Sequence, residues 1–293
     1  MDDRTTSADA ALSALIDRLH RRGRPRVWSI VVTMFGDLVL PRGGRTALSL
    51  LQEVAGRIGI EPGALRTAMS RLAADGWVER EKQGRNSFYR LAEGGRHAFD
   101  LATRRIYAGA PPSWNGSWTV LISPTEVGER EVAEAAALGF VRASGRAFLR
   151  PETEGAAPVA GSFPQMLVVH GTGAEHPETI LSFWPSSEIA SAYRAFISAL
   201  SPLAAALAEG DTLPGLDAIA ARTLLIHEWR RIVLRDPGLP AELLPGDWPG
   251  ETARALAGRI YGALSASSED WLDERGLPRP QKRTARFAPQ SSR

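Results

Sequence analysis

One short helix offers side chains suited to hydrogen bonding with nucleic acid. When residues 65–73 are projected at about 100° per residue, apolar and polar side chains separate onto opposite arcs. An apolar arc docks a helix onto its own domain, while arginine and hydroxyl side chains on the other arc can meet base edges and phosphates in the major groove of DNA. The polar arc consists of Arg66, Thr67, Ser70 and Arg71.

The residues around this helix would position it as the second helix of a helix–turn–helix. Residues 44–91 read as a helix, a tight turn, a second helix and a hairpin. Pro62 suits the first helical position, because its missing N–H would have no intrahelical partner there. Gly76 suits the left-handed residue that ends many helices. The pattern predicts that the polar arc is presented by a helix with defined ends.

A β-hairpin follows the helix and completes the pattern of a winged helix. Short β-prone runs at 78–82 and 86–91 flank a loop of hairpin length. The tip of such a hairpin, the wing, touches phosphate, and here it carries Lys82, Arg85 and Asn86. Each piece alone also fits an amphipathic helix with a solvated face beside an ordinary hairpin. The ordered combination predicts a DNA-binding winged helix.

Composition narrows the class of protein. With 293 residues, 44% hydrophobic and 23% charged, the chain is typical of a soluble globular protein with two or three domains. It has no cysteine, which excludes disulfides, thiolate zinc sites and cysteine catalysis. No apolar run approaches the roughly 18 residues of a membrane span, and the N-terminus lacks the pattern of a secretory signal. We therefore expect a cytoplasmic protein without a membrane partner, a metal or a cofactor.

The distribution of charge is more informative than the net charge of +2. Residues 1–107 carry 18 basic and 12 acidic side chains, whereas residues 108–190 carry 4 basic and 9 acidic ones. Residues 191–293 carry 13 basic and 12 acidic side chains. The basic excess therefore falls on the segment with the winged-helix pattern, as phosphate binding requires.

The pattern of turns and periodicity divides the chain into an α+β protein of three domains and a tail. Residues 1–107 form the winged helix with an N-terminal extension and a bridging helix, and residues 108–112 read as a linker. Residues 113–186 alternate strand, helix, strand and strand, which suggests a small ferredoxin-like domain. Residues 187–275 are helical, for dimerisation or effector binding. Residues 276–293 have five basic side chains and no acid, which predicts a disordered tail.

Two local expectations belong to the N-terminal domain. Residues 27–35 are apolar nearly all round and predict a buried helix. Residues 38–40, before Pro41, suggest a small strand, and Thr46 is a plausible cap for the next helix.

A second unusual stretch lies at residues 222–250. Its helix has a broad apolar arc, and its charged side chains share the opposite side at contact spacing. The apolar arc contains Leu225, Ile226, Trp229, Ile232 and Val233, and the opposite side carries His227, Glu228, Arg231 and Arg235. A salt-bridged helix face is the simplest interpretation of these charges.

The chain resembles the PaaX-like regulators, a family named for the repressor of a phenylacetic acid degradation operon. The resemblance covers nearly the whole chain and is most specific at residues 34–44, 63–95, 105–107 and 222–250. It implies an N-terminal winged helix, a central ferredoxin-like domain and a helical C-terminal domain. It further implies a dimeric transcriptional repressor released from operator DNA by a thioester such as phenylacetyl-CoA. The chain departs from the family pattern at Glu61, where a serine-like helix cap is common, and in its long loop at 152–164. The resemblance does not fix the effector, because members of the family control different catabolic operons.

An acyl-CoA effector needs an apolar slot for its acyl group and fixed positive charge for its phosphates. The helix at 222–235 is suited to both. The candidate effector residues are Trp229, Arg230, Arg231, Arg235, His227 and Glu228. The competing interpretation makes Glu228 and Arg231 a structural ion pair.

Two other classes of protein are weighed. The central domain of this family also looks like metal-dependent CRISPR ribonucleases, which need a carboxylate just past the first strand. Here that strand leads into Ser123, and Glu126 is the first acid. No hydrolase, phosphate-loop or dinucleotide motif is present, so we expect no enzyme. The third possibility is a scaffold whose winged helix binds another protein.

Overall fold

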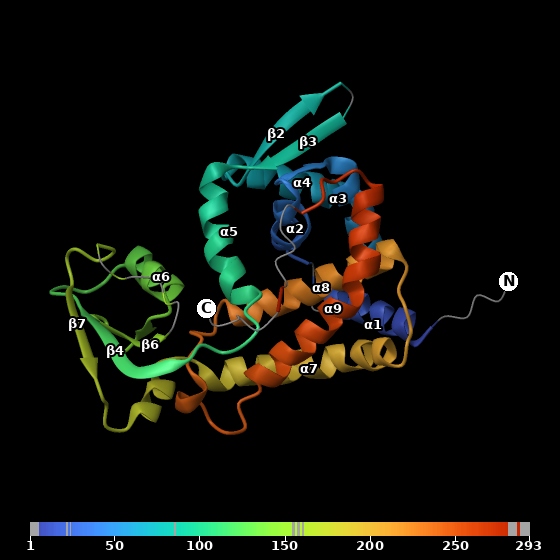
Figure 1. Ribbon diagram of the computed structural model, residues 1–293. Helices are drawn as coiled ribbons and strands as arrows, with labels where there is room; N and C mark the ends of the chain where they lie inside the picture. Colours follow the sequence, from blue (N-terminus) through green and yellow to red (C-terminus); the bar gives the residue numbers. More distant parts are fainter. Residues whose placement is uncertain are drawn as a thin grey trace. The chain divides into compact units, whose positions relative to one another are not determined.

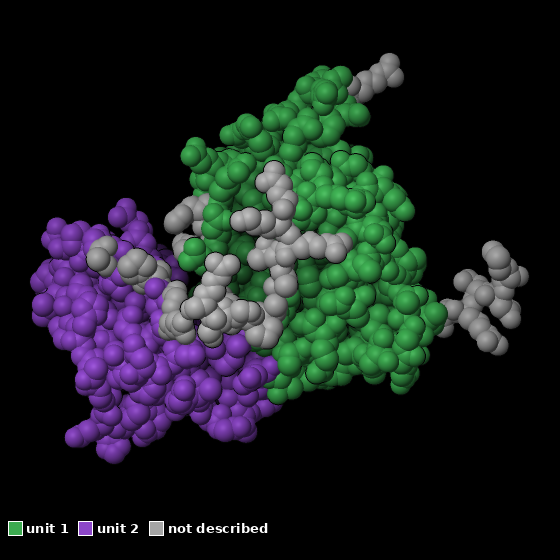
Figure 2. All heavy atoms as spheres, viewed as in Figure 1, with its two compact units in different colours: residues 1–109, 195–231, 252–288 green, residues 110–194, 232–251, 289–293 purple. Residues whose placement is uncertain are grey.

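A computed structural model of the chain describes residues 6–21, 23, 25–84, 86–153, 156, 159, 161–280 and 286–287 (Figure 1). It contains both helices and antiparallel sheets, so the fold class is α+β, as predicted. The chain divides into two compact units, coloured separately in Figure 2. Among the described residues, unit 1 comprises those within 1–109, 195–231 and 252–288, and unit 2 those within 110–194 and 232–251.

Unit 1 begins with α1 (Ser7–Arg21) and the apolar helix α2 (Val27–Met34). Ile30, Val31 and Met34 of α2 have no exposed surface, which confirms the predicted buried helix. The helix then continues through a π-helical segment, η1 (Phe35–Val39), and a 3-10 turn, η2 (Leu40–Arg42). The strand predicted at residues 38–40 is therefore wrong. Their backbone stays helical until Gly43, whose φ of 92° ends the run.

The two helices that the sequence pattern predicts on either side of a tight turn are α3 (Leu48–Arg57) and α4 (Pro62–Ala74). Pro62 lies in the first turn of α4, and Gly76 has a φ of 71°, as predicted for these two residues. Thr46 does not cap α3. It belongs to a short strand, β1 (Arg45–Ala47), and Ala47 takes the cap position without a side-chain hydrogen bond.

A three-stranded antiparallel sheet and helix α5 (Glu93–Ile106) complete the N-terminal part of unit 1. The strands of this sheet are β1, β2 (Val78–Gln83) and β3 (Asn86–Leu91), in the order β1-β3-β2. Val78 pairs with Leu91 at the base of the hairpin, and Gln83 pairs with Asn86 at its tip. Both strands predicted from the sequence are present.

Three long helices follow the central segment: α7 (Ser186–Ala208), α8 (Gly215–Val233) and α9 (Gly250–Glu274). Most of their length clusters with residues 1–109 in unit 1. This grouping differs from the separate helical domain predicted at 187–275. The physical reason is a set of buried ion pairs, described below, that joins α8 and α9 to the N-terminal elements.

Unit 2 is built on a four-stranded antiparallel sheet in the order β5-β6-β4-β7. One face packs against α6 (Glu129–Ala137) through Leu121, Phe148 and Ala135. Trp118 and Val141 belong to a second apolar cluster with η3 (Pro177–Phe183) and η4 (Ala241–Leu243). The strands are β4 (Trp114–Ile122), β5 (Val141–Arg142), β6 (Ala147–Thr153) and β7 (Leu167–Thr172).

The strand order of unit 2 is the order expected of a ferredoxin-like sheet. That fold also has a second crossover helix, which would lie between β6 and β7. The residues described there, 156, 159 and 161–166, include no helix. The ferredoxin-like assignment therefore stays a prediction.

One helix in the described part of the chain, α7, is long and apolar enough to cross a membrane by length and composition alone. Core helices of soluble proteins meet the same criterion. In α7 the side chains of Phe196, Leu200 and Leu203 are buried within the protein.

Candidate nucleic-acid interface and buried ion network

Helix α4 presents the two arcs that the sequence predicts. Leu65 and Met69 have no exposed surface, and Ala68 and Leu72 are also buried. The four candidate DNA-contacting side chains on the opposite arc, Arg66, Thr67, Ser70 and Arg71, are all exposed. The apolar arc therefore fixes the helix in unit 1 and leaves the polar arc available to a partner.

The polar side chains of α4 differ in whether they already form hydrogen bonds or ion pairs within the protein. Arg66 forms no hydrogen bond or ion pair with any described residue. The Thr67 hydroxyl donates to the Gly63 carbonyl oxygen at 3.1 Å within the helix. Arg71 lies 3.6 Å from the Asp75 carboxylate, in a pair whose side chains are 68% and 52% exposed. Arg66 can thus bind an acceptor directly, whereas Arg71 must first exchange Asp75 for it.

Successive side chains of the hairpin point to opposite faces, and this alternation places cations with acidic partners on one face and cations without them on the other. On one face Glu79 and Glu81 pair with cations of the other two strands of the sheet: Arg90 of β3 lies 2.7 Å from Glu79, and Arg45 of β1 lies 2.9 Å from Glu81. Lys82 alternates to the other face and is exposed without an acidic partner among the described residues. Asn86 is also exposed, and Arg85 lies outside the described residues.

Arg80 is a candidate phosphate contact that the sequence interpretation did not include. It is exposed, alternates onto the same face as Lys82, and donates to the Ser87 hydroxyl at 2.9 Å without an acidic partner in the described part of the chain. Counting the alternation of strand 78–83 would have found it, because Arg80 and Lys82 are two residues apart.

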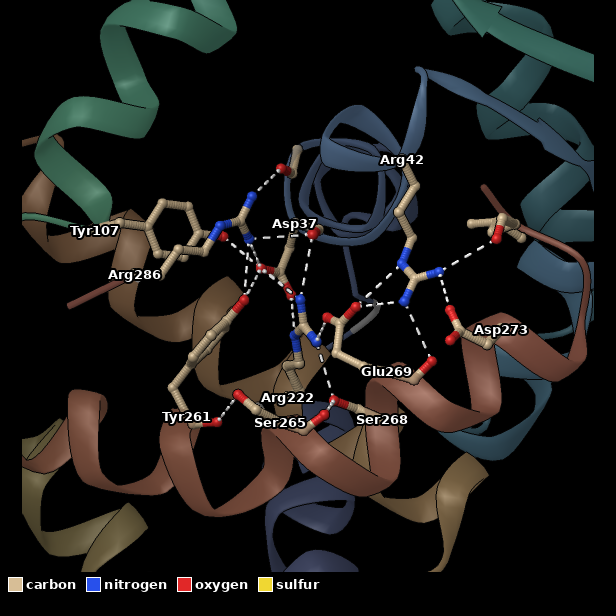
Figure 3. A network of polar contacts seen from close by, with 12 residues as sticks. Asp37, Arg42, Tyr107, Arg222, Tyr261, Ser265, Ser268, Glu269, Asp273 and Arg286 are labelled. Atoms are coloured by element: carbon tan, nitrogen blue, oxygen red, sulfur yellow. Dashed lines mark hydrogen bonds and ion pairs between the residues drawn. The ribbon is translucent and has the colours of Figure 1, made fainter. Parts of the chain in front are cut away.

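A buried ion network lies in unit 1 and is centred on Asp37 of the π-helical segment (Figure 3). Arg222 of α8 binds the Asp37 carboxylate at 2.7 Å, and the two side chains are 2% and 1% exposed. Tyr107 donates its hydroxyl to Asp37 at 2.6 Å, and Tyr261 of α9 does so at 3.1 Å. Arg286 forms a further ion pair with Asp37.

Burial and charge in the network shift the pKa values of its ionisable side chains. Burial alone would raise the pKa of Asp37, but the charges of Arg222 and Arg286 outweigh it and hold that pKa below its ordinary value. Burial, together with the Asp37 charge, raises the pKa of Tyr107 well above its ordinary value. Burial also raises the pKa of Tyr261 to about 12. Asp37 is therefore a carboxylate and both tyrosines are neutral donors near pH 7.

A second buried arginine, Arg42, extends the network along α9. It pairs with Glu269, which also binds Arg222 at 2.6 Å, and its guanidinium lies 2.7 Å from the Asp273 carboxylate. Arg42 is 2% exposed. Buried charges are tolerated only when paired and hydrogen-bonded, so the network defines how α9 packs on the turn before β1.

The network joins the separate sequence blocks that are most distinctive. Asp37 and Arg42 belong to residues 34–44, Tyr107 to residues 105–107, and Arg222 opens residues 222–250. None of these four residues was singled out for a role from the sequence. The available signal was the presence of charge inside otherwise apolar runs, as at Asp37 and Arg222.

Described residues near the end of the chain contribute to this network, whereas the sequence predicts a disordered tail at 276–293. Residues 281–285 and 288–293 of that tail lie outside the described residues. Leu277 is buried, and Arg286 is 14% exposed and lies over the Tyr107 ring at 4.0 Å. Phe287 packs against the rings of Tyr107 and Tyr261 at 5.5 and 5.4 Å. A ring and a charge with partners in the core outweigh the polar composition of the surrounding tail.

The helix proposed from sequence as an effector site is largely part of the core. Trp229 has no exposed surface, and its indole N–H donates to the Ile106 carbonyl oxygen at 2.7 Å. Arg230 donates to the Thr33 hydroxyl and to the Ser29 carbonyl oxygen, both at 2.7 Å. These contacts hold α8 against α2 and α5, which favours the structural interpretation of these side chains over an acyl slot.

His227 is buried in the same contact region. It is 4% exposed, and its Nδ1 lies 3.3 Å from the Thr33 hydroxyl. Burial, with the charges of Arg230 and Arg231, lowers the pKa of His227 to about 3. The imidazole is therefore neutral near pH 7. Burial likewise lowers the pKa of Arg230 to about 10.

The remaining candidate effector residues are more accessible. Arg231 is 55% exposed and lies 3.6 Å from Glu228, the pair anticipated from their spacing. Arg235 is exposed and belongs to unit 2. The structure therefore separates the exposed Arg231 and Arg235 from the buried Trp229, His227 and Arg230.

The nuclease alternative would need a catalytic metal centre. Among the described residues no group of three histidine, aspartate or glutamate side chains is placed to hold a metal ion. Glu126, the first acid after β4, is exposed. His170 is 2.8 Å from the Thr119 hydroxyl, and His176 is 3.7 Å from Glu178.

Comparison with known proteins gives three findings. Residues 26–95 match the PaaX-like protein family, and residues 184–274 match the PaaX-like protein C-terminal domain. Over 263 residues the chain is 30% identical to the transcriptional repressor PaaX of Escherichia coli, covering 85% of this chain and 83% of that protein. It is also similar to the solved structure of the uncharacterized protein Rv0674 from Mycobacterium tuberculosis, with a TM-score of 0.51 and 20% identity, covering 84% of this chain and 100% of that one. This last similarity concerns the fold alone.

Proposed function

The chain belongs to the PaaX-like protein family, and from this premise we propose that it is a transcriptional repressor that binds double-stranded operator DNA. The observation that carries the proposal is the exposed polar arc of α4. There Arg66 has no partner among the described residues, while the opposite arc of the helix is buried. A helix held by its apolar arc with an arginine available on the other is suited to reading base edges.

We assign the elements from β1 to β3 to a winged helix. In this assignment α4 enters the major groove through Arg66, Thr67, Ser70 and Arg71, and the hairpin lies along the phosphates. Lys82, Arg85, Asn86 and the newly identified Arg80 serve as backbone contacts. A symmetric dimer would place two such helices on a pseudo-palindrome, with half-sites about one helical turn or a multiple apart.

The proposal is tested by selecting the preferred duplex from a random pool and measuring its affinity by fluorescence anisotropy over a range of salt. We expect the selected duplex to be pseudo-palindromic and to bind one protein dimer. The affinity should fall steeply with salt, because phosphate contacts release counterions. Failure to enrich any duplex, or an affinity independent of salt, would contradict the proposal and favour a protein-interacting scaffold.

We propose that the repressor is released by an aromatic acyl-CoA thioester, as the family resemblance implies. Exposed Arg231 and Arg235 are suited to its phosphates, whereas buried Trp229, His227 and Arg230 are suited to the structural contacts they already make. Phenylacetyl-CoA should lower the affinity for the selected duplex at least tenfold, while CoA and phenylacetate at the same concentration should not. Equal effects of all three compounds would remove the thioester from the proposal.

The repressor function also accounts for the expected location. An operator on the bacterial chromosome is reached only from the cytoplasm, so we place the protein there. A nuclease activity is not favoured by any contact in the described residues. Purified protein should leave RNA and DNA intact with or without magnesium.

A further inference from the structure

The outer strand of a sheet has backbone N–H and C=O groups that another chain can pair with, and proteins protect such edges with short strands, charges, prolines or bulges. In the described part of the chain, the outer strands β1 and β5 have three and two residues, and the outer strand β2 has four charged residues, 79–82. The remaining outer strand, β7, has six residues without a charge or a proline, in a regular register with β4 (Figure 1). The edge of β7 is therefore the one most open to a partner strand.

The exposed surface beside this edge is apolar. Leu167 and Val169 of β7 are 62% and 43% exposed. Ile122 of β4 pairs directly with Leu167 and is exposed as well, and Phe183 of η3 is exposed and lines the same groove as Val169. Only Trp28, in unit 1, is a further exposed large apolar side chain among the described residues. Such a concentration of apolar surface is typical of a protein contact.

The same face of β7 has open space near its other end. Leu167, Val169 and Gly171 alternate to one face of the sheet. A Cβ added at Gly171 would meet no atom within 4 Å, and Gly171 lines the groove together with Val169. The strand therefore has a protruding leucine and, four residues later, a recess.

Two copies of β7 can bring the leucine of each strand to the recess of the other. In a symmetric antiparallel pair the two-fold axis passes between a residue and its own copy. With Val169 on the axis, Leu167 lies opposite Gly171 of the second copy, because residues 167 and 171 are equally far from residue 169. A register centred on His170 pairs as many residues of the strand but leaves Leu167 outside the ladder. The register centred on Val169 is therefore the one that covers the exposed leucine.

We propose that two copies of the chain associate through β7, with the strands antiparallel and Val169 on the two-fold axis. The two four-stranded sheets then form one continuous sheet, in which the backbone groups of the two edges bind each other. Leu167 and Val169 are removed from water at the same time. As far as this pair is the dimer that binds the operator, the inference rests on the proposed function.

The first test determines the register with single cysteines, because the natural chain has none. Directly opposite residues in an antiparallel pair have Cα atoms about 4.5–5.5 Å apart, which is within the range of about 4.4–6.8 Å for a disulfide. We expect the full-length Val169→Cys variant to form a disulfide-linked dimer under mild oxidation.

Two further cysteine variants are the matched controls. Leu167→Cys alone and Gly171→Cys alone should not cross-link, because each cysteine lies about 13 Å along the strands from its own copy. A mixture of these two variants should cross-link, since residues 167 and 171 are opposite each other. Absence of the Val169→Cys dimer, or equal cross-linking of all three single variants, would overturn the proposal.

The second test measures association in solution by sedimentation equilibrium. Val169→Lys and Val169→Glu each place like charges opposite each other, so each should be a folded monomer, by circular dichroism, where the wild type is a dimer. An equimolar mixture of the two should dimerise again, because the axis then brings opposite charges together. Trp28→Lys is the control and should remain a dimer. A monomeric wild type, dimeric charged variants or a monomeric mixture would contradict the proposed interface.

DNA binding separates a failure of this inference from a failure of the proposed function. Val169→Lys should bind a single half-site as the wild type does and the selected duplex more weakly, because the two half-sites no longer act together. If the wild type bound the duplex while Val169→Cys failed to cross-link, the repressor function would stand without this interface. If Val169→Cys cross-linked but the wild type bound no duplex, the interface would stand and the repressor function would not.

Discussion

Arginine side chains in this protein occupy three different environments, and their roles follow from the environment. Arg222 is 2% exposed and paired with Asp37, where it stabilises the packing of α8. Arg90 is exposed but neutralised by Glu79 at 2.7 Å. Arg66 is exposed without a partner among the described residues. A buried pair stabilises packing, whereas an exposed cation without an acidic partner is available to other molecules, so we expect Arg66 to contribute most to the reading of DNA.

The first prediction at the residue scale concerns α4. Arg66→Ala should weaken binding of the selected duplex by about 1–3 kcal/mol and relax its sequence preference, because a guanine edge would lose its bidentate donor. The loss of affinity on Arg71→Ala should lie at the low end of that range, because the Arg71 guanidinium already forms an ion pair with Asp75. Anisotropy with matched and single-mismatch duplexes measures both effects.

Arg130 of α6 provides a matched control for Arg71. It is 83% exposed and forms the same kind of i,i+4 pair, at 3.5 Å from Glu134, on a helix that carries no candidate DNA contact. Arg130→Ala should leave the affinity and the sequence preference unchanged. Equal losses in all three variants would mean that only net charge matters and that α4 has no special role.

The second prediction at this scale is a dependence of stability on pH through His227. Its pKa is lowered to about 3 in the folded protein, so the unfolded chain binds the additional proton as the pH falls below about 6.5. The free energy of unfolding should therefore fall with pH between about 6.5 and 3, by up to about 1.4 kcal/mol per pH unit. His227→Gln removes this titration and keeps a polar side chain.

Urea unfolding at pH 7.5 and at pH 5.0 measures the difference. From pH 7.5 to 5.0 the wild type should lose about 2 kcal/mol more than His227→Gln. Asp37 does not interfere, because its pKa is held below its ordinary value of 3.8 and its stabilising contribution is lost only at lower pH. Equal losses in the two proteins would show that the imidazole is protonated in the folded state.

At the scale of elements, the hairpin shows how alternation distributes charge. The acidic side chains of β2, Glu79 and Glu81, pair with cations of the other two strands of the sheet, and Arg80 and Lys82 face the other way. A strand of mixed composition therefore has one neutralised face and one basic face. The basic face is the one available to a phosphate backbone.

The prediction at this scale compares two arginines of one hairpin. Arg80→Ala should weaken all duplexes alike and reduce the slope of log affinity against log salt by about one, because one phosphate contact is lost. Arg90→Ala should change neither, since Glu79 and Glu81 already neutralise its charge. A salt titration with selected and random duplexes measures both. A larger effect of Arg90→Ala than of Arg80→Ala would assign the phosphate contacts to the opposite face.

At the scale of the whole molecule, the buried network makes Arg286 and Phe287, near the end of the chain, part of unit 1. Arg286 reaches the Asp37 carboxylate from 249 residues away in the sequence, and Phe287 packs between Tyr107 and Tyr261. Helices α8 and α9 reach the same carboxylate through Arg222 and Tyr261. The stability of the N-terminal elements therefore depends on the C-terminal third of the chain.

The prediction at this scale is the effect of shortening the chain. Ending the chain at residue 280 should lower the free energy of unfolding by about 3–5 kcal/mol, because a buried ion pair loses one partner. Ending it at residue 287 keeps Arg286 and Phe287 and should change the stability little. Arg286→Met tests the charge alone and should fall between the two. An unchanged melting temperature after shortening to residue 280 would show that the tail contributes nothing to the core.

Local patterns in the sequence were sufficient for the elements that carry the candidate DNA interface. The helix from Pro62 to Ala74, its buried arc and the following hairpin were predicted correctly, because periodicity, proline and glycine act over a few residues. The same local signals failed at residues 38–40. There a short apolar run before a proline continued as a helix, because the hydrogen bonds of the preceding turn outweighed its weak strand preference.

Only the tertiary structure decided which distant side chains share an environment. Trp229 and Arg230 were candidate effector residues on a helical projection, yet their contacts with Ile106, Ser29 and Thr33 favour a structural role. Asp37 and Arg222 are 185 residues apart, and no pattern in the sequence indicated that they form a pair. A charge is stable inside a protein only beside an opposite charge, and the position of that partner depends on how the whole chain packs.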